Sequence, residues 1–267
     1  MGNCNKVTVI TVCYNAAKSI EATMLSVLGQ TYGQMEYIII DGGSMDGPQE
    51  IIERVRRETE GAEKRIVWYA SEPDKGIYDA MNKGLAHASG DWVNFMNAGD
   101  TFADDKVLED IFGEKPLGKS RQSGQSESSA SSNTAIKDEV KVIAGCTINI
   151  LKDGEETYYP AAPEALAREM MCSHQALFVR LSPEEPWRFD THYRIAADYN
   201  LLHSIYKNFG AQAFLRVDRA VARYECTESF SLKSRIAAKK EYLRIQREWT
   251  KTWWWNEWKR LWLGKYK

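Results

Sequence analysis

Short apolar runs recur along the amino-terminal part of the chain and are separated by longer amphipathic stretches. Residues 7–12 and 37–40 are apolar and rich in β-branched side chains, so we predict two strands that are buried on both faces. Residues 66–70 and 92–96 show similar runs and predict a third and a fourth strand. Strands that alternate with helices indicate a parallel sheet with right-handed crossovers.

The stretches between these strands have helical spacing. Residues 20–28 predict a helix with Ser19 at its N-cap, and residues 49–58 predict a charged, amphipathic helix. Residues 77–88 predict a third helix, because small or apolar side chains recur there every three or four positions. This order of elements is typical of a nucleotide-binding half-domain.

The pattern changes after the fourth strand. Residues 118–133 contain seven serines and no large apolar side chain, so we predict a flexible surface insertion over residues 118–139. The insertion is either a mobile loop over a site or a tolerated addition to the surface. Beyond it, the pattern predicts one or two strands at residues 140–150, a helix from near Ala196 and a last strand at residues 214–224.

Together these elements predict an α/β fold with a mixed, mostly parallel central sheet flanked by helices. We place the folded domain at residues 1–232, with a nucleotide-binding half at residues 1–112 and an acceptor and catalytic half at residues 140–232. Residues 233–267 are expected to form an amphipathic helical tail. A chain of 267 residues is long enough to bury a substantial core.

Charge is unevenly distributed along the chain. The formal net charge is −2, yet residues 233–267 hold eleven Lys and Arg against three Glu, which is +8 and leaves the other 232 residues at −10. The acidic body argues against nucleic acid as a partner. The basic tail indicates an anionic surface instead.

The tail is also rich in tryptophan. Six of the nine tryptophans lie between Trp249 and Trp262 and are interleaved with Lys and Arg. Such side chains favour the bilayer interface, and the tail is too polar to span a bilayer. We therefore expect residues 233–267 to contact a membrane surface. The alternative is a helix that packs its tryptophan face on the body or on a second subunit.

The five cysteines are scattered and show no C-x-x-C spacing, which indicates a reducing compartment and argues against a disulfide framework or a zinc cluster. Cys13 lies beside a motif and is expected to be a small buried hydrophobe rather than a nucleophile. The sequence shows no signal peptide and no apolar run long enough to span a bilayer. We expect a cytoplasmic protein at the cytoplasmic face of the inner membrane.

Polar side chains follow each of the four strands at its carboxyl end, where strands of an open α/β sheet form a ligand crevice. The Gly42-Gly43-Ser44 turn permits close approach of a ligand to the backbone and offers N–H donors at a helix N-terminus. Neither G-x-G-x-x-G nor G-x-x-x-x-G-K-[ST] occurs in the chain. The dinucleotide-binding and P-loop classes therefore lack their fingerprints.

Two stretches resemble a known family. TVCYNAAKSIEATMLSVLGQTYGQMEYIIIDGGSMDGPQEII is similar to the amino-terminal signature of the family 2 glycosyltransferases, in which Tyr-Asn, Ser-x-x-x-Gln-Thr and Asp-Gly-Ser-x-Asp-Gly follow one another. EPDKGIYDAMNKGLAHASGDWVNFMNAGD resembles the nucleotide and metal section of that family. The resemblance covers residues 6–112 well, and CSHQALFV and YRIAADYNLL more loosely. It implies a GT-A fold and is strongest for the branch that acts in bacterial surface polysaccharide assembly.

The resemblance implies a binding site for a nucleotide-sugar donor, expected to be UDP-linked. Its residues would be Thr11, Tyr14 and Asn15 around base and ribose, Asp41 as acceptor of a hydrogen bond from the base, Asp74 and Lys75 near the nucleotide, and Asp79 and Asn82 on the helix behind.

The resemblance also implies a divalent cation, Mg²⁺ or Mn²⁺, that Asp100 would ligate and that would bridge the two phosphates. The family's motif is often Asp-x-Asp or Asp-Asp, whereas this chain has Asn97 at the first acidic position. Asn97 can still orient the ribose or a metal-bound water. Asp100 has the alternative of capping the next helix. His174 is either a group near the phosphates or metal, or a structural hydrogen-bonding side chain.

By resemblance, Asp198 matches the catalytic base of the family. It is expected at the amino-terminal end of its helix, where a carboxylate is stabilised as an anion. It would take the proton from an acceptor hydroxyl while that oxygen attacks the anomeric carbon opposite the leaving diphosphate, which inverts the configuration. The alternatives are that Asp198 only caps its helix, or that Asp190 is the base.

We therefore predict a metal-dependent, inverting glycosyltransferase that moves a sugar from a nucleotide-diphosphate donor to a hydroxyl of a lipid-linked or polysaccharide acceptor. One alternative is a nucleotidyltransferase that makes nucleotide sugars. That class requires a Gly-rich triphosphate loop with Arg or Lys near the start, where this chain has TVCYNAAKS. The other alternative is a catalytically inactive subunit that binds nucleotide sugars.

Overall fold

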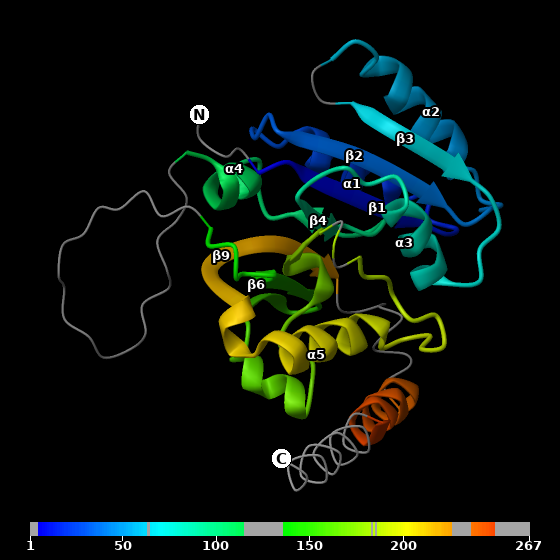
Figure 1. Cartoon of the computed structure of the whole chain (residues 1–267). Helices are drawn as coiled ribbons and strands as arrows, with labels where there is room; N and C mark the ends of the chain where they lie inside the picture. The colour runs from blue at the N-terminus through cyan, green and yellow to red at the C-terminus, as the bar shows by residue number, and fades with distance from the viewer. Residues whose placement is uncertain are drawn as a thin grey trace, which may run out of the picture.

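The structure is a computed structural model of the chain (Figure 1). It describes residues 5–62, 65–114, 136–182, 184, 186–225 and 236–248. The serine-rich stretch of the predicted insertion and the six clustered tryptophans of the tail lie outside the described residues.

The described helices and strands follow in chain order: β1 Val7–Cys13, α1 Ile20–Leu28, β2 Met35–Asp41, α2 Pro48–Glu58, β3 Ile66–Ser71, α3 Ile77–Leu85, β4 Trp92–Phe95, β5 Thr101–Phe102, α4 Val107–Phe112, β6 Val142–Leu151, β7 Gly154–Tyr158, η1 Pro163–Ala167, η2 His174–Ala176, β8 Leu177–Arg180, α5 Ala197–Phe209, η3 Ala211–Ala213 and β9 Phe214–Glu225. The η elements are 3₁₀ turns.

The strands form one mixed sheet in the order β3-β2-β1-β4-β8-β6-β9-β5, and β7 pairs with β6 outside this path. β1 pairs in parallel with β2 and with β4, and β2 pairs in parallel with β3. β8 pairs antiparallel with β4 and β6, so strand direction changes where the two halves of the chain meet. The predicted α/β fold with a mixed sheet is confirmed, and parallel pairing dominates its amino-terminal half.

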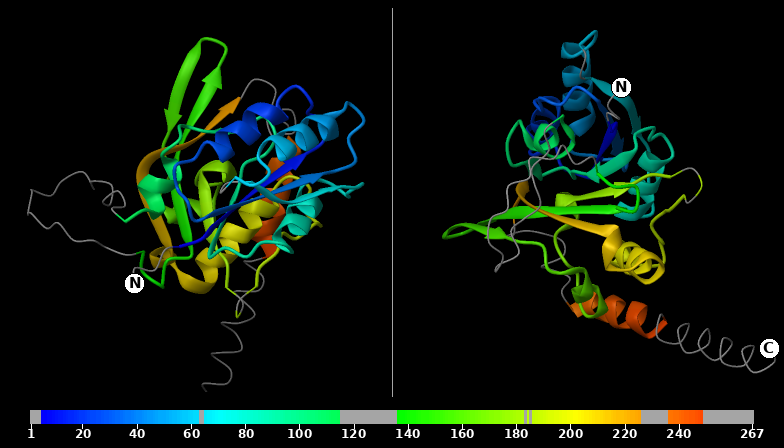
Figure 2. Two further views of the ribbon diagram at one scale, coloured as in Figure 1. Left: turned by 90° about the horizontal axis from the view of Figure 1, so that it is seen from above. Right: turned by 60° about the vertical axis from the view of Figure 1, so that its left-hand side comes forward.

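Helices lie on both sides of the sheet, and each side has its own core (Figure 2). Successive side chains of β1 point to opposite faces. Ile10 and Val12 join the core that includes residues of α3 and α5, while Val7 and Val9 join the core that includes residues of α1, α2 and α4. Burial on both faces explains why β1 is apolar at odd and even positions alike.

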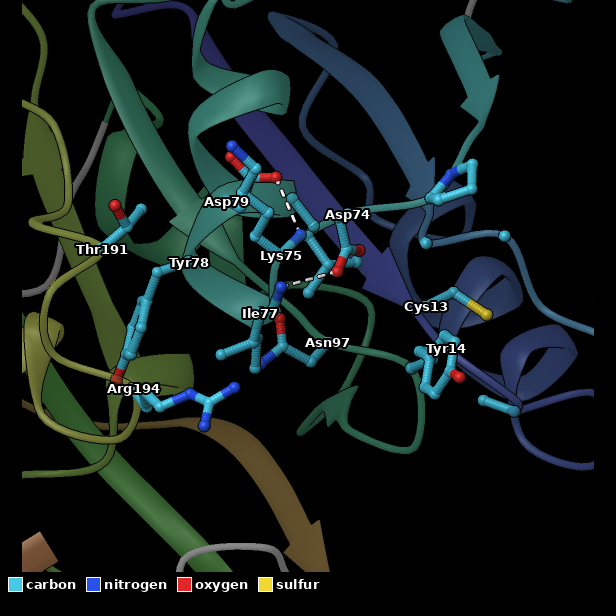
Figure 3. A pocket seen from close by; sticks show the side chains of 18 of the residues that line it. Cys13, Tyr14, Asp74, Lys75, Ile77, Tyr78, Asp79, Asn97, Thr191 and Arg194 are labelled. Atoms are coloured by element: carbon cyan, nitrogen blue, oxygen red, sulfur yellow. Dashed lines mark hydrogen bonds between the residues drawn. The ribbon is translucent and has the colours of Figure 1, made fainter.

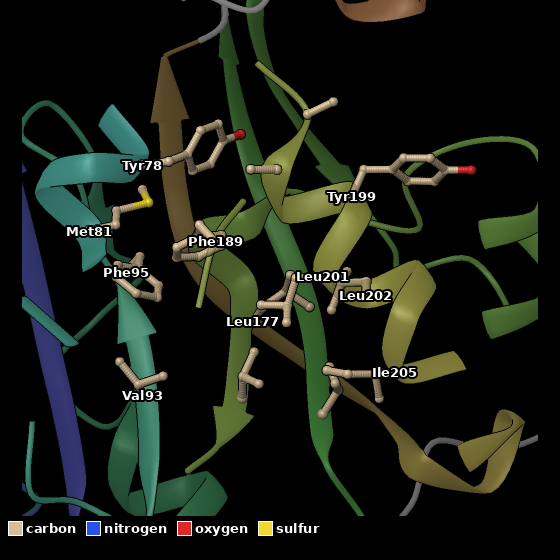
Figure 4. Close-up of a cluster of buried hydrophobic side chains, with 14 of the residues drawn as sticks. Tyr78, Met81, Val93, Phe95, Leu177, Phe189, Tyr199, Leu201, Leu202 and Ile205 are labelled. Carbon is tan, nitrogen blue, oxygen red and sulfur yellow. The ribbon is translucent and has the colours of Figure 1, made fainter. Parts of the chain in front are cut away.

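Aromatic rings fill the core between α3 and α5 (Figure 4). Phe189 packs against Tyr78, Phe95 and Trp187, with ring centroids 5.2, 5.2 and 5.7 Å apart. The side chain of Asn82 on α3 accepts a hydrogen bond from the Phe189 N–H and donates one to its carbonyl, both at 2.9 Å. The segment before α5 is thereby fixed to the amino-terminal half of the fold.

Residues 236–248 form a helix that packs on the second half of the fold and is drawn in orange below α5 in Figure 1. Ile245 on this helix is fully buried, and the ring of Tyr242 lies 4.5 Å from that of Tyr199 on α5. The first part of the predicted tail is therefore packed against the domain.

Expected and observed elements agree closely where the hydrophobic pattern is strong. The helix expected at residues 20–28 is α1, and the strand expected at residues 37–40 is the centre of β2. Ser19 is the N-cap residue of α1, but its side chain makes no capping hydrogen bond. The sequence did not reveal β5 and α4, because elements of two and six residues are too short to show a period.

Candidate active site

A cavity of about 910 Å³ lies beyond the carboxyl ends of β1, β2 and β4 (Figure 3). Residues after β1 and β2 and the turn into α3 line it, and so does the segment before α5. Five of the residues expected near a donor line this cavity, namely Tyr14, Asp74, Lys75, Asp79 and Asn97. The strand ends thus converge on one cavity, as in other open α/β sheets.

Tyr14 and Gly42 belong to the wall formed by the amino-terminal strands. The Tyr14 side chain is 67% exposed, so its ring is accessible to a planar base. A Cβ atom on Gly42 would lie 2.2 Å from Asp74 Oδ2 and 3.4 Å from Tyr14 Cδ2. Glycine at position 42 therefore lets the turn after β2 pass close to Asp74 without a clash.

Asp74 and Asp79 shape the turn that leads into α3. The N–H of Gly76 donates to Asp74 Oδ1 at 2.8 Å, and the N–H of Lys75 donates to Asp79 Oδ2 at 3.0 Å (Figure 3). Burial raises the pKa of the Asp74 carboxyl above its usual value, and the hydrogen bond from Gly76 opposes this rise. The two carboxylates fix the backbone, and Lys75 stays exposed at the cavity.

Thr11 does not reach the cavity, contrary to its expected place beside the base and ribose. It lies on the same face of β1 as Val9, and its side chain is fully buried. Its hydroxyl donates to the carbonyl of Met96 at 2.7 Å and lies 2.8 Å from the Tyr37 hydroxyl. Thr11 therefore joins β1 to its neighbours and does not line the cavity.

Asp41 is fully buried at the end of β2, and its carboxylate accepts hydrogen bonds from other groups of the protein. Its Oδ2 accepts hydrogen bonds from the Ser44 N–H at 3.1 Å and from Gln49 at 3.0 Å. Ser71 donates to Oδ2 at 2.6 Å, and the Ser44 hydroxyl donates to Oδ1. Four hydrogen bonds use the acceptor capacity of a carboxylate. Asp41 thus closes the turn after β2, which corrects its expected role as acceptor for the base.

Asn15 also serves the backbone rather than the cavity. Its φ of 50° lies in the left-handed region, which asparagine tolerates better than most residues. Its N–H donates to Ser44 Oγ at 2.7 Å, and its Oδ1 accepts from the Met45 N–H at 3.0 Å. Asn15 therefore ties the loop after β1 to the loop after β2, and it does not line the cavity.

His174 links the two halves of the candidate site. Its Nε2 lies 2.8 Å from Asn97 Nδ2, and its Nδ1 lies 3.8 Å from Asp198 Oδ2. With the Asn97 amide nitrogen as donor, Nε2 is the acceptor, and the neutral ring carries its proton on Nδ1 toward Asp198. Burial lowers the pKa of His174, and the nearby Asp198 carboxylate opposes this shift.

Asp100 is a buried carboxylate with one neutral side-chain partner. It is 7% exposed, and Gln175 Nε2 donates to its Oδ2 at 2.8 Å. Burial raises the pKa of Asp100 to about 7, and the bond from Gln175 only partly offsets this. Asn97 Oδ1 and Gln175 Oε1 are buried and lack a hydrogen-bond partner. A buried carboxylate and buried amide oxygens without partners are the kinds of group that a hard cation prefers as ligands.

Asp100 and His174 were expected to be metal ligands together, but the His174 ring faces Asn97 and Asp198 instead. Both ring nitrogens of His174 face protein groups, so the imidazole offers no open position. Within the described ranges, no cluster of three or more His, Cys, Asp or Glu side chains could hold a metal ion. The oxygen chemistry of the Asp100 carboxylate fits a hard cation such as Mg²⁺ or Mn²⁺.

Asp198 lies in the first turn of α5, as the spacing predicted. Its Oδ1 accepts a hydrogen bond from its neighbour's backbone, the Tyr199 N–H, at 2.8 Å. Its side chain is 17% exposed. The carboxylate is placed where the α5 dipole stabilises negative charge.

Tyr78, a residue of the cavity wall, holds the segment around Asp198. Its hydroxyl lies 3.0 Å from Asp198 Oδ1 and 2.7 Å from the Ile195 carbonyl oxygen. Asp190, the alternative base, lies instead on the preceding loop. Its Oδ1 accepts from both the N–H and Nδ1 of His192, at 3.0 and 2.7 Å.

Sequence reasoning missed three residues of this site. Arg194 is exposed and lines the cavity from the segment before α5, on the side away from Tyr14 (Figure 3). Tyr78 contacts the carboxylate of Asp198, and Gln175 donates a hydrogen bond to the carboxylate of Asp100. A signal was present, since Arg194 lies four positions before Asp198 and Gln175 directly follows His174.

Comparison with known proteins finds relatives of the amino-terminal half. Residues 8–114 match the model of the family described as Glycosyl transferase family 2. The chain is 42% identical over 103 residues to an uncharacterized glycosyltransferase of Mycobacterium tuberculosis, a match that covers 38% of this chain and 37% of that protein. It is 38% identical over 105 residues to TuaG of Bacillus subtilis, a candidate teichuronic acid biosynthesis glycosyltransferase, covering 39% of this chain and 40% of TuaG.

These curated relatives are thus matched over 40% of their length or less. Solved structures extend the likeness to most of the chain. A mannosyltransferase from Pyrobaculum calidifontis, in complex with GDP-Man and Mn²⁺, matches 92% of this chain and 64% of its own with a TM-score of 0.63 at 15% identity. TarS of S. aureus in complex with UDP-GlcNAc matches 86% of this chain and 61% of its own with a TM-score of 0.61 at 16% identity. The chain therefore has the GT-A fold, and its residues 8–114 match the Glycosyl transferase family 2 model.

Proposed function

We propose that this protein is an inverting glycosyltransferase that moves a sugar from a nucleotide-diphosphate donor to a hydroxyl of a surface-glycan acceptor. The observation that carries the proposal is the line from Asn97 through His174 to Asp198. Asn97 lies at the strand end where a donor would bind, and Asp198 lies at the start of α5. The line therefore brings a donor cavity and a candidate base side by side, as sugar transfer requires.

The donor would occupy the cavity of about 910 Å³. The exposed ring of Tyr14 would stack on the base, and the turn at Asp74 would meet the ribose. Lys75 and Arg194 line the same cavity and would bind the diphosphate, since exposed cations pair readily with phosphate oxygens. The UDP-GlcNAc in TarS and the GDP-Man in the mannosyltransferase from P. calidifontis support a nucleotide-diphosphate sugar as the donor.

The acceptor hydroxyl would lose its proton to Asp198 as its oxygen attacks the anomeric carbon. The Tyr78 hydroxyl and the Tyr199 N–H hold Asp198 Oδ1, so Oδ2, which His174 Nδ1 faces at 3.8 Å, would receive the proton. Attack from the face opposite the departing diphosphate inverts the anomeric centre. His174, neutral near pH 7 because burial lowers its pKa, would hold Asn97 and face Asp198 without adding charge.

A divalent cation would be held by Asp100, with Asn97 Oδ1 and Gln175 Oε1 as further oxygen ligands. When bound, it would neutralise the negative charge that grows on the departing diphosphate. The Mn²⁺ in the mannosyltransferase from P. calidifontis supports this assignment.

The relatives support an acceptor in surface-glycan synthesis. TuaG is named for teichuronic acid biosynthesis, and another match is a poly-β-1,6-N-acetyl-D-glucosamine synthase of Staphylococcus aureus. The basic, tryptophan-rich residues 249–267 would bring the site to an acceptor at the cytoplasmic face of the membrane. No helix in the described part of the chain is long and apolar enough to cross a membrane.

The test is a panel of UDP-, GDP- and TDP-sugars incubated with the protein, Mn²⁺ and membrane extract, with release of nucleoside diphosphate as the readout. We expect release from one class of donor, suppression by EDTA, and a product of inverted anomeric configuration by NMR. Tight donor binding without release under any condition would identify the inactive binding subunit instead. Release of pyrophosphate from a nucleoside triphosphate and a sugar phosphate would identify a nucleotidyltransferase.

A further inference from the structure

The strongest unexplained feature near the site is the carboxylate of Glu241, which belongs to the helix at residues 236–248. Its Oε1 accepts a hydrogen bond from the N–H of Arg194, and its Oε2 accepts from the N–H groups of Ile195 and Ala196, all at 2.9 Å. Three successive backbone donors thus converge on one side chain that lies 45 or more positions away in the sequence.

These donors need a partner from outside their own segment. Ala196 is the N-cap residue of α5 and has no side chain that could cap the helix. Of the three, only the Ala196 N–H belongs to the amino terminus of α5, where N–H groups carry partial positive charge and lack intrahelical acceptors. Hydrogen bonds to an ionised carboxylate are stronger than those between neutral groups, and Glu241 supplies that carboxylate from the carboxyl-terminal helix.

The same short segment is held from its other side. The carbonyl of Ile195 accepts from the Tyr78 hydroxyl at 2.7 Å, while the Ile195 N–H donates to Glu241. The peptide groups at this residue are therefore fixed by α3 on one side and by the helix at residues 236–248 on the other. Backbone held by two elements has little freedom to move.

Two functional side chains depend on this segment. Arg194 projects from it into the cavity, and Asp198 follows it by two residues in the first turn of α5. A shift of about 1 Å in a catalytic group can lower a rate by about a hundredfold. Glu241 contacts neither the cavity nor Asp198 in any hydrogen bond described, so its influence on them would pass through the backbone.

We propose that Glu241 is a positioning residue, which sets the place of Arg194 against the donor diphosphate and of Asp198 against the acceptor hydroxyl. This inference rests on the proposed glycosyltransferase function. It makes the carboxyl-terminal helix a working part of the site, with a role beyond joining the domain to the tail.

The test compares Glu241→Ala and Glu241→Gln with wild type. Glutamine keeps one acceptor oxygen and the shape of the side chain, so Glu241→Gln should retain part of the activity that Glu241→Ala loses. We expect Glu241→Ala to lower kcat for nucleoside diphosphate release at least about tenfold and Glu241→Gln to fall between it and wild type. Hydrogen exchange of the amides of residues 194–196 should accelerate in the same order.

Gln246→Ala is the matched control, because Gln246 lies on the same helix and bonds the Arg168 carbonyl and the Tyr199 hydroxyl. We expect it to lower the Tm by a similar amount while leaving kcat within about twofold of wild type. If Glu241→Ala lowers kcat no more than Gln246→Ala does, or leaves exchange at residues 194–196 unchanged, the inference is overturned. If wild type itself releases no nucleoside diphosphate, the proposed function fails, whereas the exchange arm still decides whether Glu241 holds the segment.

Discussion

The hydroxyl of Tyr78 and the carboxylate of Asp198 lie 3.0 Å apart, although 120 positions separate them in the sequence. Tyr78 belongs to α3, which follows the third strand of the donor half, and Asp198 belongs to the first turn of α5. The contact joins residues 8–114, which match the Glycosyl transferase family 2 model, to the half of the chain that carries the candidate base. It therefore fixes the candidate base against the wall of the cavity.

Asp198→Asn is expected to abolish most activity, because an amide cannot take a proton from the acceptor hydroxyl. We expect kcat to fall by about 10² to 10⁴, with donor affinity within about threefold of wild type. Steady-state release of nucleoside diphosphate and titration with UDP measure the two quantities. Asp190→Asn is the control and should retain wild-type kcat, since Asp190 binds His192 on the preceding loop. The reverse result would make Asp190 the base.

Tyr78→Phe removes the hydroxyl that bonds Ile195 and Asp198 and leaves the packed ring in place. We expect the loss of one buried hydrogen bond to lower the free energy of unfolding by about 1 kcal/mol. We expect kcat to fall several-fold, because Asp198 loses a partner that orients it. Urea unfolding and steady-state kinetics measure the two effects. A kcat equal to that of wild type would show that Tyr78 serves packing alone.

Asp100→Asn should make the metal-free protein more stable at alkaline pH. Burial raises the pKa of Asp100 in the folded protein to about 7, so the unfolded chain ionises first, and wild type loses stability as the pH rises from the unfolded pKa to about 7. Above this pH we expect the variant to gain on the order of 2 kcal/mol over wild type. Below the pKa of the unfolded chain, both forms of Asp100 are protonated and the difference should vanish. Thermal unfolding in EDTA at pH 8 and at about pH 4 measures the gain.

With Mn²⁺ bound, wild type should become more stable than Asp100→Asn at pH 8. A cation binds the ionised carboxylate, so it should raise the Tm of wild type more at pH 8 than at pH 6. Asp100→Asn should show a much smaller rise at either pH. An equal Mn²⁺ response in variant and wild type would remove Asp100 as the metal ligand.

Glu36→Gln is expected to destabilise the fold by about 2 kcal/mol at pH 7. Burial alone would raise the pKa of Glu36, but hydrogen bonds from Lys6, Thr8 and Ser89 outweigh it and hold that pKa below its usual value. Because the pKa is lower in the folded than in the unfolded state, this stabilisation is present above the unfolded pKa. It is lost as the pH falls through the folded value.

The stability difference between wild type and Glu36→Gln should therefore narrow when urea unfolding is repeated below about pH 4. The exposed Glu58 gives the control, since Glu58→Gln should change stability by less than about 0.5 kcal/mol. A difference between wild type and Glu36→Gln that is the same at both pH values would contradict the ion-pair network around Glu36.

A chain that ends at residue 248 tests the membrane contact. It keeps the helix at residues 236–248 and Glu241, whereas a cut at residue 233 would also remove them and confound the result. Residues 249–267 hold five Lys and Arg and the six clustered tryptophans. We expect their loss to abolish co-sedimentation with vesicles that contain anionic lipid, with the Tm unchanged. Unchanged sedimentation would remove the anchor.

The amino-acid sequence by itself determined the main strands and helices of residues 1–112 and the sheet edge at which the cavity lies. Strands β1, β2 and β4 are buried on both faces, and polar residues follow their carboxyl ends; such patterns are local. The position of Asp198 in the first turn of α5 was local too, since the helical spacing of residues 199–206 fixed the start of the helix.

Only the tertiary structure decided which polar side chains face the cavity and which hold the backbone. Asp41 and Asn15 have the residue types and spacing of ligand-binding groups, yet their atoms are used by Ser44 and its neighbours. Glu241 shows the converse, because nothing in its own stretch of sequence relates it to α5. Hydrogen-bond partners come from segments far apart in the chain, so the sequence supplied the candidate groups while the packing of the two halves assigned their roles.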